Sequence, residues 1–205
     1  MLDSRRVAHH MPCRTASRAV LAPLMLLLPA LAAAAEEPRR PLAPRETAAA
    51  REQARLCERL SGMPAVEACR AALALGISPA RRPAIRELLA RQLVTLERWD
   101  ELAELYRERV RLDPADAVAW QRLGSTLLYA LGLPAEAIGA LQQAARLAPD
   151  AETELALAVA LATVRRSSEA VAAFEAALRL DPHVLDGRPA SSDLFEAARQ
   201  GRAWP

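Results

Sequence analysis

The chain has 205 residues, which is enough for one domain or two small ones. Hydrophobic residues make up 52% of it and charged residues 25%, so the chain is too apolar to be wholly disordered. All 27 basic residues are arginine, and the formal net charge of +2 lies mostly in residues 1–35. The remainder is close to neutral and lacks the basic surface that nucleic acid binding needs. Abundant Ala, Leu, Arg and Glu favour an all-helical protein.

Residues 1–35 have the pattern of a secretory signal peptide. Arginines precede an uncharged run from Ala19 to Ala35, and this run ends in small residues before Glu36. We therefore expect cleavage near Ala33 or Ala35, and a mature chain that is periplasmic or secreted. The alternative is an uncleaved membrane anchor, which a run so short and interrupted by prolines supports less well.

The rest of the chain is built from repeats of one length. Leu89, Leu123 and Leu157 recur at a constant spacing, and a small residue follows each of them. A Leu-Asp-Pro or Leu-Ala-Pro motif closes each unit. In the middle unit, the repeated residues of the second helix come one residue later than this spacing predicts, and in the next unit the shift is gone. We interpret this as one extra residue in the turn Leu131–Pro134. A fixed period of this length is typical of a stacked repeat protein.

These units resemble the tetratricopeptide repeat (TPR) family. The middle unit meets the motif of this family with Trp120, Leu123, Gly124, Ala137, Leu141 and Pro149. The resemblance implies an all-α fold, an α-solenoid of stacked helix–turn–helix hairpins with a C-terminal capping helix. The predicted segments are a signal peptide (1–35), a proline-rich leader (36–45), a degenerate TPR-like hairpin (46–80), a TPR-like repeat (81–114), two TPR repeats (115–149 and 150–182) and a C-terminal capping segment (183–205).

One helical hairpin cannot bury its own apolar face, so stacking on neighbours must supply the core. Small residues such as Gly124 and Ala137 are expected to let the two helices of a hairpin approach closely. The aromatic residues are expected to pack in this core, namely Trp99, Tyr106, Trp120 and Phe174.

A last helix is expected to close the stack. Ser191 or Ser192 could cap its start, and it would run to about Gln200, with Gly201 ending it. Leu194 and Phe195 would then cover the open end of the last repeat.

Two cysteines, Cys57 and Cys69, remain after the signal peptide. Each lies about one helical turn from the turn of the first hairpin, which leaves an offset along the helices of only about 3 Å. Outside the cytoplasm such a pair usually forms a disulfide, and we predict that bond here. The alternative is a pair of buried thiols.

The resemblance also implies a binding surface, because the first helices of such repeats line a groove that takes extended peptides or helices. By register, its lining residues are Glu87, Arg91, Thr95, Gln121, Arg122, Ser125, Tyr129, Leu155 and Val159. One hypothesis is a ligand with an acidic end near the two arginines and an apolar end near Leu155 and Val159. The other is that the C-terminal tail, with Leu194, Phe195 and Trp204, covers the apolar end.

No catalytic motif, cofactor fingerprint or metal-ligand cluster is found in the sequence. We therefore expect a non-enzyme, namely a protein–protein interaction adaptor or assembly factor of the bacterial envelope with a protein or peptide partner. Membrane contact is expected only through an uncleaved signal. Two alternatives stay open, a structural accessory subunit of a larger envelope complex and a hydrolase that uses carboxylates alone. A cleft holding two acids with raised pKa values would favour the hydrolase.

Overall fold

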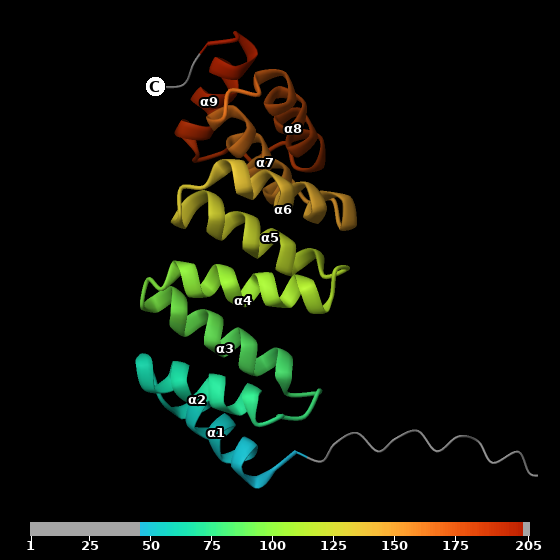
Figure 1. The fold of residues 1–205 in the computed structure, drawn as a ribbon. Coiled ribbons are helices and arrows are strands. Elements are labelled where there is room, and N and C mark those ends of the chain that lie inside the picture. Colours follow the sequence, from blue (N-terminus) through green and yellow to red (C-terminus); the bar gives the residue numbers. More distant parts are fainter. Residues whose placement is uncertain (1–45, 203–205) are drawn as a thin grey trace, which may run out of the picture. The chain divides into compact units, whose positions relative to one another are not determined.

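A computed structural model of the protein describes residues 46–202, and within this stretch it contains helices and no strand (Figure 1). The signal peptide, the leader and Trp204 lie outside the described residues. The helices are α1 (Ala48–Arg59), α2 (Met63–Ala74), α3 (Arg82–Thr95), α4 (Trp99–Leu112), α5 (Ala117–Ser125), the π-helical segment η1 (Thr126–Ala130), α6 (Pro134–Leu147), α7 (Ala151–Thr163), α8 (Ser167–Leu180) and α9 (Pro189–Arg199).

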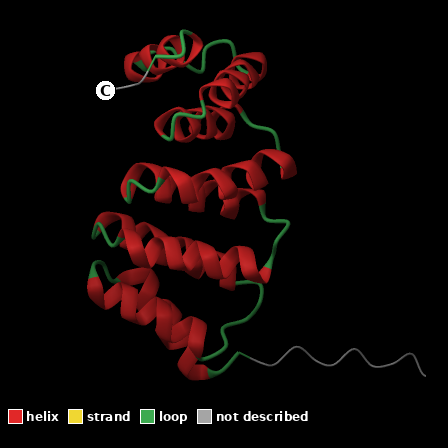
Figure 2. Ribbon diagram, turned by 45° about the horizontal axis from the view of Figure 1, so that its top comes forward, coloured by secondary structure: helices red, strands yellow, loops and turns green. Residues whose placement is uncertain are grey.

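Consecutive helices pack on one another in chain order and form the hairpins α1–α2, α3–α4, α5–α6 and α7–α8 (Figures 1 and 2). A single connected apolar core runs through all of these hairpins into α9. Leu89, Leu123 and Leu157 occupy equivalent buried places in it, with 3%, 5% and 7% of their surface exposed. The predicted all-α solenoid is confirmed, since each hairpin buries its apolar face against the next.

The aromatic side chains belong to this core to different degrees. Phe174 and Tyr106 are buried, whereas Trp99 and Trp120 are half-buried and pack against the core from its edge. The indole Nε1 of Trp120 donates a hydrogen bond to the Pro114 carbonyl oxygen at 3.0 Å. This bond satisfies the polar end of a side chain that is otherwise apolar.

Several helices begin at a side-chain cap. The carboxylates of Asp116 and Asp150 accept hydrogen bonds from the backbone N–H groups three residues on, at 2.9 and 3.0 Å. Helix α9 begins differently, because Pro189 is its first residue and no side chain caps it. The expected cap at Ser191 or Ser192 is therefore wrong, since the residue at the cap position is Arg188, three or four residues earlier. Proline is favoured at the first position of a helix, where its missing N–H group would have no helical partner.

The extra residue of the third hairpin lies inside a helix and not in the following turn. The turns inside the last three hairpins each contain a residue with a positive φ angle, namely Glu97, Gly132 and Arg165. The interval from Glu97 to Gly132 is longer than the interval from Gly132 to Arg165. The addition therefore precedes Gly132. It is absorbed by η1, where Leu131 N–H donates to the carbonyl oxygen of Thr126, five residues back, at 3.1 Å.

Gly124 lets α5 and α6 approach closely. A Cβ atom at this position would lie 2.5 Å from Cγ and 3.2 Å from the backbone nitrogen of Leu141, which is fully buried. Real Cβ atoms essentially never show the first of these distances, and the second is tighter than most of their contacts, so Leu141 would have to move. By contrast, α3 and α4 pack less closely, and there Leu102 takes the place that Ala137 has in the next hairpin.

We expect Gly124→Ala to destabilise the protein by about 1–2 kcal/mol, because overpacking against Leu141 costs more than the gain in helix propensity. Gly139→Ala is the matched control, since Gly139 lies in α6 with nothing within 4 Å of its Cβ position. That change should stabilise the protein by about 0.5–1 kcal/mol. Urea denaturation followed by circular dichroism measures both, and equal effects of the two changes would contradict close packing at Gly124.

A disulfide joins Cys57 of α1 to Cys69 of α2, with 4.8 Å between the Cα atoms. Both residues are buried, so the bond lies in the core of the first hairpin. The structure thus agrees with the predicted pairing.

Candidate protein-binding groove

The residues predicted to line the groove come from α3, α5, η1 and α7, and the structure places them in different surroundings. Glu87, Arg91 and Thr95 are exposed on α3. They are four residues apart, which puts them on one side of that helix. On α5, Arg122 is exposed, and Gln121 and Ser125 are half-buried.

Part of this surface forms a pocket of about 590 Å³ between the end of α3 and the helices α4, α5 and η1. Its lining residues are Val94, Glu97, Trp99, Leu102, Tyr106, Arg122, Ser125, Thr126, Tyr129 and Ala130. Three of these belong to the predicted groove, namely Arg122, Ser125 and Tyr129. We call this site the groove pocket.

Tyr129 projects from η1 and has 63% of its surface exposed, which is unusual for so large an apolar ring. Val94, at the end of α3, is 46% exposed and lines the same pocket. π-Helical bulges occur frequently at functional sites. Tyr129, the most exposed aromatic side chain of the pocket, lies in the segment η1 that contains the extra residue.

The groove pocket has a positive charge at Arg122, which lies near the Tyr106 hydroxyl. Burial raises the pKa of the Tyr106 hydroxyl above its usual value, while nearby Arg122 lowers it and Glu87 raises it by smaller amounts. Arg91 and Arg122 form no ion pair with any other residue between 46 and 202. Their guanidinium groups are therefore available to an anionic group.

The apolar end of the predicted groove differs from the expectation. Leu155 is only 2% exposed and offers no surface to a ligand, while Val159 is half-buried. Helix α9 packs on α7 and α8, and the ring of Phe195 lies 5.0 Å from that of Phe174. A free apolar site at Leu155 is therefore wrong, while coverage of this end by the tail stays a hypothesis, because the contact of Phe195 is with α8 and Trp204 lies outside the described residues.

An ion pair holds the beginning of α9 against α7. Arg188 donates hydrogen bonds to both carboxylate oxygens of Glu152, one of them at 2.8 Å. The hydrogen bond with Glu152 raises the pKa of Arg188. Burial raises the pKa of the Tyr129 hydroxyl, while Arg188 lowers it and Glu152 raises it by smaller amounts, so this pair lies beside Tyr129.

Residues 46–202 contain few features of metal binding or of acid–base catalysis. No group of three or more His, Cys, Asp or Glu side chains there is arranged to hold a metal ion. One carboxyl group, that of Glu154, has a pKa raised by burial, an effect that Arg179 partly offsets. Likewise, none of the helices described combines the length and apolar character needed to span a bilayer.

Sequence reasoning missed seven of the ten residues that line the groove pocket. Val94, Glu97 and Trp99 lie at the end of α3 and the start of α4, and register with the first helices alone does not select them. The available signal was Leu102, a large residue where the next unit has Ala137. A bulky side chain at a place of close approach predicts that the two helices stand apart.

No protein-family model and no curated protein matches the chain. Several solved structures match the chain in fold. A MamA protein (MamA RS-1 ArsTM double mutant) has a TM-score of 0.54 at 17% identity, covering 77% of this chain and 96% of that chain. TTC0263, a thermophilic TPR protein of Thermus thermophilus, has a TM-score of 0.50 at 24% identity, covering 72% and 78%. The TPR2B domain of yeast Sti1, in its complex with pHsp70, has a TM-score of 0.49 at 24% identity, covering 57% and 95%.

The protein therefore has the fold of tetratricopeptide repeat proteins, as its sequence predicted. The sequence identities are low, so the likeness extends to the fold alone.

Proposed function

We propose that the protein is a non-catalytic protein–protein interaction adaptor or assembly factor of the bacterial envelope, which binds a segment of a partner protein in the groove pocket. The observation that carries this proposal is the combination, in one pocket, of the exposed Tyr129 and Val94 with the unpaired Arg122. Tyrosine, tryptophan and arginine are the residues enriched at the energetic centres of protein interfaces. The fold supports the proposal as well, because stacked repeats of this kind present extended binding surfaces.

The charges and shape of the pocket suggest what the partner segment carries. Arg122 would pair with a carboxylate, which a guanidinium binds through two parallel hydrogen bonds. Val94, Trp99 and Tyr129 would cover an apolar side chain close to that carboxylate. The pocket is lined by α3, α4, α5 and η1, and the next residue of the predicted groove, Leu155, is buried, so the segment would lie on these four elements.

Two features support an exported protein. Residues 1–35 have the pattern of a signal peptide. The Cys57–Cys69 disulfide is typical of an oxidising compartment such as the periplasm.

The proposal is tested by replacing Tyr129 with the photo-crosslinking residue benzoylphenylalanine in cells and isolating the periplasmic fraction. We expect one discrete crosslinked protein, because Tyr129 lies at the mouth of the pocket. Adding Arg122→Glu should reduce the product by about tenfold, the loss expected for a central interface arginine. Glu175, exposed on α8, is the control site for the crosslinker and should give no discrete product.

A product that is equally strong from Glu175, or that is unchanged by Arg122→Glu, would contradict the binding site. Absence of the protein from the periplasmic fraction would contradict the proposed location. Recovery of the partner at a fixed stoichiometry without crosslinking would show a permanent subunit in place of an adaptor.

A further inference from the structure

Among the described residues that line the groove pocket, two are charged, and their charges are opposite. One is Arg122 of α5, and the other is Glu97, which lies in the turn between α3 and α4. Both are exposed, and neither forms an ion pair with any other residue between 46 and 202. Each of them is therefore available to an opposite charge on a bound segment.

The two charges lie at opposite ends of the groove pocket. Arg122 lies near the Tyr106 hydroxyl, in the second half of α4. Glu97 comes two residues before Trp99, the first residue of α4. It also lines a small hollow together with Leu131, the residue that follows η1. Both α4 and the segment α5–η1 therefore lead from one charge to the other.

The rise of a helix gives the separation of these ends. Trp99 and Tyr106 are seven residues apart on α4, and Arg122 and Leu131 are nine residues apart, so the two charges stand about 10–13 Å apart along the pocket. In an extended segment, residues four positions apart are separated by about 13 Å and point to the same side, as does the residue midway between them. An extended segment can therefore place residues i and i+4 at the two charges and residue i+2 between them.

Apolar side chains dominate the lining between the two charges. Val94 and Tyr129 are the exposed members of this lining, and Leu102 lies buried beneath them. Covering Val94 and Tyr129 with an apolar side chain removes their surface from water, which stabilises the complex. The middle position of the bound segment is thus expected to be apolar.

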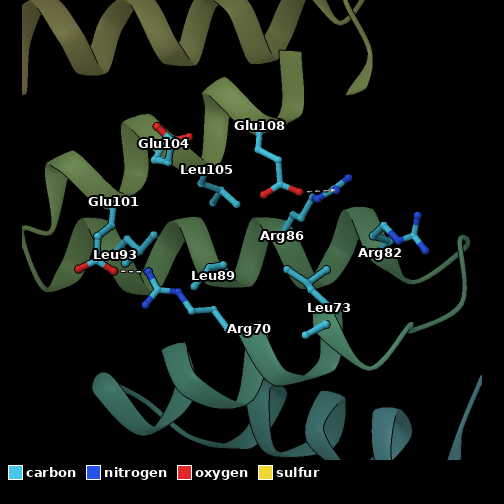
Figure 3. A pocket seen from close by; sticks show the side chains of 11 residues that line it. Arg70, Leu73, Arg82, Arg86, Leu89, Leu93, Glu101, Glu104, Leu105 and Glu108 are labelled. Carbon is cyan, nitrogen blue, oxygen red and sulfur yellow. Dashed lines mark hydrogen bonds and ion pairs between the residues drawn. The ribbon is translucent and has the colours of Figure 1, made fainter. Parts of the chain in front are cut away.

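A second pocket, also of about 590 Å³, lies between α2, α3 and α4, on another side of α4 (Figure 3). Arg70 pairs there with Glu101, and the guanidinium of Arg86 lies 3.6 Å from the carboxylate of Glu108. Because these four charges are paired within the chain, they do not select a charged ligand. In the groove pocket, by contrast, the two charges stand apart and have no partner among residues 46–202.

We propose that the groove pocket selects an extended partner segment with an acidic and a basic residue on either side of an apolar one, at positions i, i+2 and i+4. The acidic side chain would pair with Arg122, the apolar one would cover Val94 and Tyr129, and the basic one would pair with Glu97. This inference rests on the proposed function, and it adds the basic residue and the spacing to the acidic and apolar groups already inferred.

The test compares two peptides that differ in one charge, acetyl-Glu-Ser-Leu-Ser-Lys-amide and acetyl-Glu-Ser-Leu-Ser-Glu-amide. Binding to the full chain is followed by ¹H–¹⁵N NMR. We expect saturable shift changes at Val94, Ser125 and Tyr129 with the lysine peptide. The second peptide should bind about fivefold more weakly, because its last glutamate would face the like charge of Glu97.

Glu97→Arg should reverse this preference, so that the peptide with two glutamates binds about fivefold more tightly than the lysine peptide. A residue with a merely structural role would not exchange one preference for the other. Glu175→Arg is the matched control, since Glu175 is exposed on α8 and the change in charge is the same. This variant should keep the preference of the original protein.

Absence of saturable shifts with the lysine peptide, equal affinities for the two peptides, or an unreversed preference of Glu97→Arg would overturn the proposal. The crosslinking experiment in cells separates it from the proposed function. Glu97→Arg should weaken the product formed from position 129 about fivefold. If Arg122→Glu removes this product and Glu97→Arg leaves it unchanged, the binding site stands and the pattern of acidic, apolar and basic residues is wrong.

Discussion

Replacing Phe174 by alanine is expected to lower the free energy of unfolding by about 3–5 kcal/mol. Phe174 has none of its surface exposed, and its ring packs against Phe195 with 5.0 Å between the centroids. The change removes an aromatic side chain from α8 and leaves a cavity where α8 supports α9. Urea denaturation followed by circular dichroism gives the difference in stability.

Leu180→Ala is the control for this change, because Leu180 lies on the same helix with 49% of its surface exposed. Its loss should cost about 0.5 kcal/mol or less, as for most surface positions. If the two changes cost the same, Phe174 does not occupy the core of a stacked hairpin, and the packing described for α7, α8 and α9 is wrong.

Removing the disulfide is expected to destabilise the protein by about 2–3 kcal/mol. The double change Cys57→Ala and Cys69→Ala frees the unfolded chain from a short closed loop, and it also removes two buried sulfur atoms from the first hairpin. Alanine is preferred over serine here because a buried hydroxyl without a partner would add its own cost. Thermal or urea denaturation measures the loss.

A reducing agent supplies the control within the same experiment. It should destabilise the original protein by a similar amount and leave the double variant unchanged. Mass spectrometry checks that the cysteines of the original protein have been reduced. If they have been reduced and the denaturation curve has not moved, the bond does not contribute to stability.

The groove residues show what the repeat register alone can predict about a binding site. Arg122, Ser125 and Tyr129 share a pocket, as their places in successive turns of one helix indicate. Leu155 occupies the register of Gln121 in the next repeat, but it is buried whereas Gln121 is half-buried. Register specifies the side of a helix on which a residue lies, whereas exposure depends on what packs on that side from elsewhere in the chain.

The extra residue of the third hairpin shows the same limit. The unequal spacing of the repeat landmarks shows that an insertion exists, but it does not say whether the turn or the helix absorbs it. Its placement in η1 depends on hydrogen bonds of the helix end. Tyr129 lies in this segment, but the equivalent residues Thr95 and Thr163 are also exposed in ordinary α-helices, so the register alone accounts for its exposure.

The repeat period, the hairpins and the paired cysteines were all readable in the order of residues, because contacts within a hairpin join residues that are close in the chain and recur in every unit. The groove pocket was not, because it depends on how α3, α4 and α5 pack together. Leu102, which stands where the next hairpin has Ala137, accompanies the looser packing of α3 on α4. Distances between helices result from the packing of many side chains at once, so they are decided in three dimensions.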